Sequence, residues 1–135
     1  MLEQDYLMRM ILMLAAAIRE ALLKGESGAD RSEMDRMALE DAIGMAADMD
    51  ASVLLALEPE SVSTVLLLGQ VDDSVAEYLV HAMMLDASYL EEDGYADMAD
   101  LRRRQADSVA ESFGLIYEPG RLPQLLVVLD DQSQP

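Results

Sequence analysis

The sequence contains no cysteine and no tryptophan, and it has a single histidine among its 135 residues. The absence of cysteine excludes disulfides, thiolate nucleophiles and cysteine-ligated metal sites. A single histidine also excludes metal sites that need two histidine ligands. No catalytic residue, cofactor-binding residue or metal ligand is therefore predicted, and we expect no cofactor.

Basic residues are also scarce, with 9 Lys and Arg against 27 Asp and Glu, which gives a formal net charge of -18. This balance disfavours nucleic acids and anionic membrane surfaces as partners, because both require an excess of positive charge. It is compatible with a soluble protein that resists self-association, or with a basic partner.

The N-terminus is acidic where a secretory signal is basic, and the apolar stretch 6–18 contains Arg9. We expect a cytoplasmic protein with no membrane span.

Aromatic residues number only six, although 52% of the residues are hydrophobic. The core must therefore be built mainly from Leu, Ala, Met, Val and Ile, a composition that favours helices. A chain of this length forms one domain by default, here 1–135. The composition predicts an all-α fold, a helical bundle.

The stretch 72–113 predicts two antiparallel helices, 72–92 and 95–113, joined by a tight turn. Asp72 or Asp73 can cap the first helix, because a short carboxylate accepts hydrogen bonds from the free N–H groups of the opening turn. Gly94 can end that helix, because glycine adopts the left-handed conformation without steric cost. In the second helix, the inward residues are expected to include Tyr95, Met98, Ala99, Ala106, Val109, Ala110 and Phe113.

Helical spacing of apolar residues predicts further helices at 2–24, 33–48 and 59–68, with a short helical piece at 51–57. The segment 25–32 contains two glycines and is expected to be a loop. Residues 123–129 are expected to form a short helix, with a strand as the less favoured alternative. Residues 129–135 are expected to be a frayed tail.

Two stretches resemble known families. The opening Gln4-Asp5-Tyr6-Leu7-Met8-Arg9 resembles the start of a family of small bacterial helical proteins of unknown function, and this resemblance implies no activity. The hairpin resembles one tetratricopeptide repeat in the spacing of its small residues, Ala87, Leu90, Gly94, Ala99 and Ala106. That resemblance implies a close helix pair, although Asp86 and Arg103 stand where the repeat prefers large apolar residues.

Candidates for chemistry are few. His81 lies one turn after Glu77 on the predicted polar side of its helix, where it is a general base or an exposed ion pair. The second interpretation is favoured, so His81 is expected to face solvent and to have no functional role. The cluster Arg102-Arg103-Arg104 has acidic residues one turn away, including Asp100, and predicts a neutralised helix face.

Helix 2–24 is apolar around more of its circumference than one interface requires. The strip Met8, Ile11, Leu12 and Ala15 is expected to contact a second subunit, unless the segment after Pro123 covers it. The sequence thus predicts a non-catalytic protein-interaction module that binds another protein or forms a homodimer. The alternative is an enzyme or small-ligand binder that uses carboxylates and His81. Convergence of Tyr78, Tyr89 and His81 on one cleft would favour that alternative.

Overall fold

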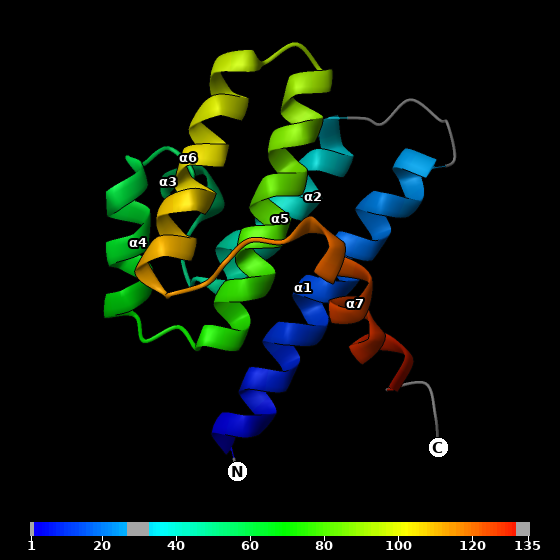
Figure 1. The fold of residues 1–135 in the computed structure, drawn as a ribbon, viewed down its shortest axis with the longest axis vertical. Coiled ribbons are helices and arrows are strands. Elements are labelled where there is room, and N and C mark those ends of the chain that lie inside the picture. The colour runs from blue at the N-terminus through cyan, green and yellow to red at the C-terminus, as the bar shows by residue number, and fades with distance from the viewer. Residues whose placement is uncertain (1, 27–32, 132–135) are drawn as a thin grey trace.

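The computed structural model describes residues 2–26 and 33–131 (Figure 1). Over these ranges the chain forms seven α-helices and one short 3₁₀ helix, and it contains no strand, which confirms the predicted all-α class. The elements are α1 (Leu2–Glu26), α2 (Glu33–Ala46), α3 (Ala51–Leu54), α4 (Pro59–Leu68), α5 (Asp73–Glu92), α6 (Ala96–Ser112), η1 (Pro119–Arg121) and α7 (Leu122–Asp131).

Helix α5 lies at the centre of the bundle and packs against α1, α2 and α6. Its side chains are buried on most of its circumference; Ala76, Leu79 and Met83 are almost fully inaccessible to solvent. Helix α4 packs on the outer side of α6, and α7 packs on α1 (Figure 1). The predicted antiparallel hairpin is α5–α6.

The predicted helix ends of the hairpin are confirmed. The Asp72 carboxylate accepts a hydrogen bond from the Ser74 N–H at 2.8 Å and caps α5. Gly94 has a φ of 93°, which lets the Tyr95 N–H donate to the Leu90 carbonyl at 2.8 Å. This left-handed closure turns the chain back at once, so that α6 begins beside the end of α5.

Other predicted boundaries need small corrections. Helix α2 ends at Ala46 rather than 48, and the piece expected at 51–57 is helical only over Ala51–Leu54. Residues 122–131 form a helix, so the strand alternative is wrong and any frayed tail begins after 131 rather than at 129. The rest of the predicted tail, 132–135, and most of the predicted loop, 27–32, lie outside the described residues.

The buried face of α6 differs from the predicted face. Tyr95 and Met98 were expected to point inward, but they are 47% and 45% exposed. The inward positions between Ala99 and Val109 are instead taken by two polar side chains, Arg102 and Gln105, which are 2% and 0% exposed. The prediction failed here because it assigned the inward face by hydrophobicity alone.

Candidate functional site

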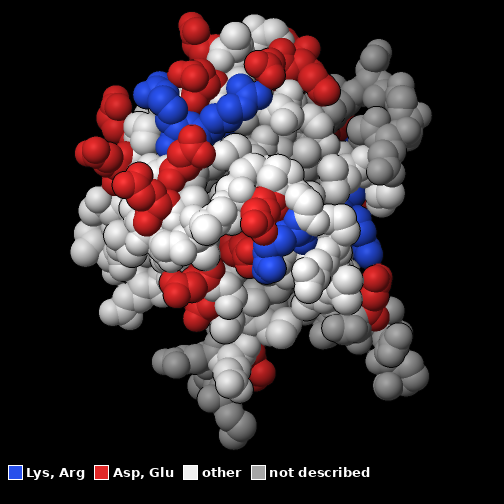
Figure 2. Space-filling view, viewed as in Figure 1, with Lys and Arg blue, Asp and Glu red and all other residues white. Residues whose placement is uncertain are grey.

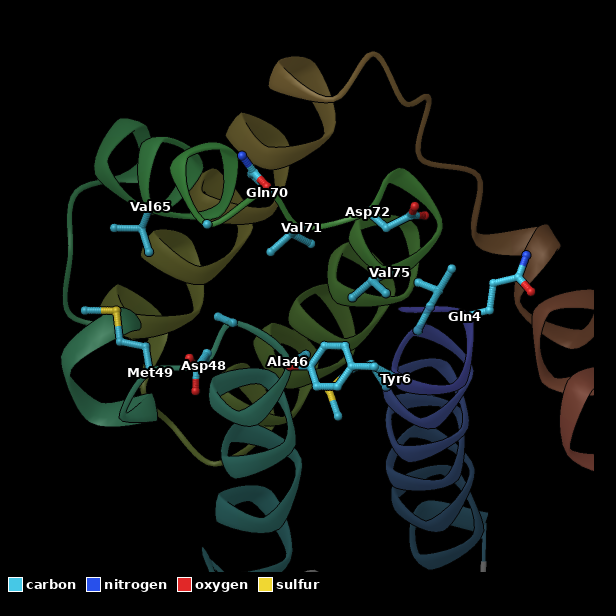
Figure 3. A pocket seen from close by; sticks show the side chains of 14 residues that line it. Gln4, Tyr6, Ala46, Asp48, Met49, Val65, Gln70, Val71, Asp72 and Val75 are labelled. Atoms are coloured by element: carbon cyan, nitrogen blue, oxygen red, sulfur yellow. The ribbon is translucent and has the colours of Figure 1, made fainter. Parts of the chain in front are cut away.

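An apolar groove of about 930 Å³ lies where four helix ends meet: the start of α1, the ends of α2 and α4, and the start of α5 (Figure 3). Leu7 and Met10 of α1, Val65 of α4 and Val75 of α5 contribute its apolar lining. In Figure 3 the Tyr6 ring reaches from α1 toward the end of α2, below Val71 and Val75. The size and lining are typical of a surface that receives apolar groups.

Polar residues at the edge of the groove have an unusual backbone conformation. Asp48 and Gln70 have φ values of 55° and 57°, in the left-handed region that favours glycine. Each closes a helix: the Met49 N–H donates to the Gly44 carbonyl at 2.9 Å, and the Val71 N–H donates to the Leu66 carbonyl at 3.1 Å. The chain therefore carries the strain of a non-glycine residue at two neighbouring turns, both of which line the groove.

The turn at Asp48 depends on a glycine in α2. A Cβ on Gly44 would lie 2.7 Å from the Met49 carbonyl oxygen and 2.8 Å from the Ala51 nitrogen. Both neighbours are backbone atoms, so a side chain here has no flexible group to push aside. The missing side chain of Gly44 lets the chain fold back closely over α2 and sets the edge of the groove that carries Asp48.

A second cluster of polar residues is buried around Arg102. Its guanidinium donates from Nε to Asp86 Oδ2 at 2.8 Å and from Nη1 to the Leu55 carbonyl at 3.0 Å and Gln105 Oε1 at 2.8 Å. Its Nη2 lies 3.3 Å from Glu40 Oε2. One side chain thus joins α2, α5 and the segment after α3 to α6, which is a structural role for a buried guanidinium.

Gln105 completes this cluster. Its Nε2 donates to the carbonyls of Leu55 and Leu57 at 3.0 and 2.8 Å. These carbonyls belong to the turn between α3 and α4, where no helix supplies them with a partner. The amide therefore ties the α3–α4 turn to α6, and this explains a polar side chain at an inward position.

Asp86 is fully buried, and burial followed by the neighbouring Glu40 raises its pKa to about 8, against the opposing effect of Arg102. Among the described residues, no donor gives a hydrogen bond to the buried oxygen Asp86 Oδ1. A proton on Asp86 explains both observations, because a neutral carboxyl costs less to bury and can donate a hydrogen bond from its protonated oxygen. Asp86 does not line the groove, so its carboxyl has no access to a substrate there.

His81 is buried, with 4% of its surface exposed, so the prediction that it faces solvent is wrong. The segment after α6 folds back over α5 and places Tyr117 against it, with ring centroids 4.9 Å apart. Arg121 fixes this segment through two contacts to Glu77, at 2.9 and 3.2 Å. Burial lowers the pKa of His81, and Glu77 and Arg121 act on it in opposite directions. Tyr117, which covers His81, lies more than thirty residues later in the sequence, so the periodicity of α5 alone could not predict that His81 is buried.

The apolar strip predicted on α1 is largely covered within one chain. Ile11 is 9% exposed and Ala15 is fully buried, Leu12 is half-buried, and only Met8 is exposed, at 41%. Arg19, one turn beyond Ala15, pairs with Asp130 at 3.6 Å, which places α7 along this face. Ile11 and Ala15 are thus buried within one chain and α7 packs on α1, as in the alternative in which the segment after Pro123 covers the strip; contact of the strip with a second subunit stays a prediction.

The arginine cluster divides into one buried and two exposed residues. Arg103 pairs with Glu91 at 2.9 Å, and Arg104 pairs with Asp100 at 3.1 Å, as predicted for the i,i+4 pair. Figure 2 shows the basic side chains over α6 bordered by acidic ones on this face of the molecule. The predicted neutralised face is present for Arg103 and Arg104, whereas Arg102 belongs to the buried cluster.

The tyrosines and the histidine do not converge on one cleft. The Tyr78 hydroxyl donates to the Leu125 carbonyl at 2.6 Å, and the Tyr89 hydroxyl donates to the Ala21 carbonyl at 2.9 Å.

Within residues 2–26 and 33–131, no three His, Asp or Glu side chains are grouped so that they could hold a metal ion. Over the same part of the chain, no helix combines the length and apolar character that crossing a bilayer requires.

Comparisons with known proteins add no relative. No protein-family model matches the chain, and no curated protein or solved structure is significantly similar to it. The groove and the buried cluster around Arg102 are therefore the features that bear on function.

Proposed function

We propose that this protein is a non-catalytic helical module that binds another protein through the groove between α1, α2, α4 and α5. One observation carries the proposal: the apolar groove and the buried ionisable side chains lie in different parts of the molecule. The groove is lined mainly by apolar side chains, whereas Asp86, Arg102 and His81 are buried elsewhere in structural contacts. An open apolar surface with a polar edge is the usual form of a docking site for a helix.

The alternative, an enzyme or small-ligand binder that uses carboxylates and His81, has less support. His81 packs under Tyr117 and Asp86 has no exposed surface, so neither group reaches the groove. Perturbed carboxyl groups often mark active sites, but they do so where a cleft brings substrate to them. The raised pKa of Asp86 follows instead from its burial beside Glu40.

Membership of the family of small bacterial helical proteins suggested by residues 4–11, and the tetratricopeptide character of α5–α6, remain part of this proposal. A cytoplasmic location also belongs to it. None of these carries the argument for binding, which depends on the groove alone.

Photocrosslinking tests the proposal. A photoreactive amino acid replaces Tyr6, which lines the groove, or Tyr95, which is similarly exposed outside it. After irradiation in the native cell, we expect a covalent adduct of protein mass at position 6 and none at position 95. The adduct at position 6 should disappear when Met10→Glu is introduced in the groove. An adduct of small-molecule mass at position 6, or equal protein adducts at both positions, would refute the proposal.

A homodimer is the second form of partner predicted from the sequence. Two residues of its expected surface, Ile11 and Ala15, are buried within one chain, which leaves Met8 and the half-buried Leu12 for contact with a second subunit. We therefore favour a different protein as the partner. Sedimentation of the wild-type chain at micromolar concentration distinguishes the two cases.

A further inference from the structure

The charge around the groove points to the chemistry of its partner. Asp48 and Asp72 are exposed acidic residues among those that line it. Among the described residues of this lining, none is Lys or Arg. An apolar centre with carboxylates at the edge and no cation nearby favours a partner with apolar and positively charged groups side by side.

The helix ends at the groove do not offset this negative charge. Helices α2 and α4 both finish here, and the C-terminal end of a helix carries about half a unit of negative charge. The N-terminal ends of α1 and α5 carry the opposite partial charge, so the four helix ends nearly cancel, and the negative charge of the Asp48 and Asp72 carboxylates remains. The local balance is therefore negative, in the same sense as the net charge of the chain, -18.

Four left-handed helix closures in the described part of the chain provide an internal comparison. Gly94 and Gly114, which lie away from the groove, close α5 and α6 with glycine. Asp48 and Gln70, which line the groove, close α2 and α4 with polar side chains in the same conformation. Glycine would adopt this conformation at lower cost, so these side chains are explained by what they present at the groove rather than by the turn itself.

We infer that the partner presents a basic amphipathic helix, whose apolar side chains enter the groove and whose Lys or Arg residues face Asp48 and Asp72. This inference rests on the proposed function. A helix fits because apolar residues at i, i+3 or i+4, and i+7 form one narrow ridge that an apolar groove can take. The acidic surface of the whole chain then accelerates encounter with such a segment.

The test uses two synthetic peptides of about 16 residues, long enough to form a helix. They share one leucine face, and their polar positions carry Lys in one peptide and Glu in the other. Binding is measured by fluorescence anisotropy, and the binding site is located from the methionine methyl signals in an NMR titration. Met10 and Met49 line the groove, whereas Met34 and Met98 are exposed and outside it. The Lys peptide should bind and shift the signals of Met10 and Met49 but not those of Met34 and Met98.

Two sets of variants separate local recognition from general attraction between opposite charges. Asp48→Gly removes a carboxylate and relieves the left-handed strain, and Asp72→Ser removes a carboxylate while keeping a side chain that can cap α5. Together they should weaken binding of the Lys peptide about tenfold. Asp107→Asn removes an exposed charge from α6, outside the groove, and should weaken binding by less than about twofold.

A matched pair of tyrosine variants tests the apolar contact. Tyr6→Ala, in the groove, should weaken binding about tenfold, because truncating an aromatic contact residue commonly costs at least this much. Tyr95→Ala removes a ring of similar exposure outside the groove and should leave binding unchanged. Thermal unfolding verifies that each variant is folded.

Three outcomes would overturn the inference. Equal binding of the Lys peptide to wild type and to all variants would mean attraction to the net charge alone. Binding of the Glu peptide in a Tyr6-dependent manner would refute a basic partner while leaving a protein-binding groove, and so the proposed function, in place. Shifts of Met10 and Met49 with a small apolar probe, and with neither peptide, would refute the inference and also count against the proposed function.

Discussion

Among individual residues, Asp86 makes the stability of the protein depend on pH between about pH 4 and pH 8. Its folded-state pKa is about 8, whereas the pKa of an aspartate in an unfolded chain is close to 3.8. The folded state therefore binds a proton that the unfolded state has already released between these two values. The stabilising contribution of this group is full below about pH 4 and is lost as the pH rises toward 8.

Asp86→Asn should remove this dependence. Asparagine keeps an oxygen that accepts from Arg102 and carries N–H groups where the protonated carboxyl carries its O–H, so it mimics the protonated carboxyl. Near pH 5 we expect the variant and the wild type to have similar free energies of unfolding. Near pH 8 the variant should be more stable, by roughly 2–4 kcal/mol. Urea unfolding at both pH values measures this difference.

Asp100→Asn is the control for this prediction. Asp100 makes an exposed i,i+4 pair with Arg104, and such a pair contributes only about 0.3–0.5 kcal/mol. Its removal should lower stability slightly, with no reversal between pH 5 and pH 8. If Asp86→Asn and the wild type lose stability in parallel over this range, Asp86 is not protonated in the folded state.

At the scale of secondary-structure elements, the turn between α2 and α3 determines the shape of the groove. Gly44→Ala would bring a Cβ within 3 Å of the backbone of Met49 and Ala51, so the turn must move. We expect a loss of about 1–3 kcal/mol in the free energy of unfolding, similar to other overpacked sites. Thermal or urea unfolding measures this loss.

Gly120→Ala is the matched control for Gly44→Ala. No atom lies within 4 Å of a Cβ built on Gly120, and its φ is not in the left-handed region. The substitution should therefore be neutral or slightly stabilising, because it restricts the unfolded chain. A Gly44→Ala variant as stable as Gly120→Ala would show that the α2–α3 turn is free to move.

For the whole molecule, α7 determines which surfaces are available. Ile11 is only 9% exposed because other parts of the same chain pack over it. Ile11→Glu therefore places a charge in the core. We expect wild type to sediment as a monomer, and Ile11→Glu to lose much of its far-UV helix signal and to unfold at lower denaturant concentration. Met8→Glu, on the exposed neighbouring position, should keep the wild-type signal. A wild-type dimer that Ile11→Glu dissociates into helical monomers would contradict this arrangement.

The sequence predicted the parts of this fold that depend on local physics. The α5–α6 hairpin and the cap at Asp72 follow from neighbouring residues, and these predictions are confirmed. The errors concern residues whose environment comes from distant segments. Arg102 is buried because Asp86, Glu40 and the Leu55 carbonyl surround it, whereas its neighbour Arg104 pairs with the exposed Asp100. Periodicity cannot distinguish these two arginines.

The groove could not have been predicted for the same reason. Its walls come from four helix ends, and its edge includes two left-handed residues that are not glycine. Sequence rules assign that conformation to glycine first, and Gly69 directly follows the predicted helix 59–68. In the structure Gly69 is right-handed, and Gln70 takes the left-handed position. The feature that still points to the groove is Tyr6, an exposed aromatic residue among apolar neighbours at the start of α1.

The packing of α7 on α1 also has a consequence for synthesis of the chain on the ribosome. About a hundred residues separate the end of α1 from the start of α7, which takes roughly 5–20 s to translate at typical rates. During this interval the nascent α1 helix has no α7 to pack on it. We expect chaperones that recognise apolar segments to bind α1 during this interval and to be displaced when α7 packs on it.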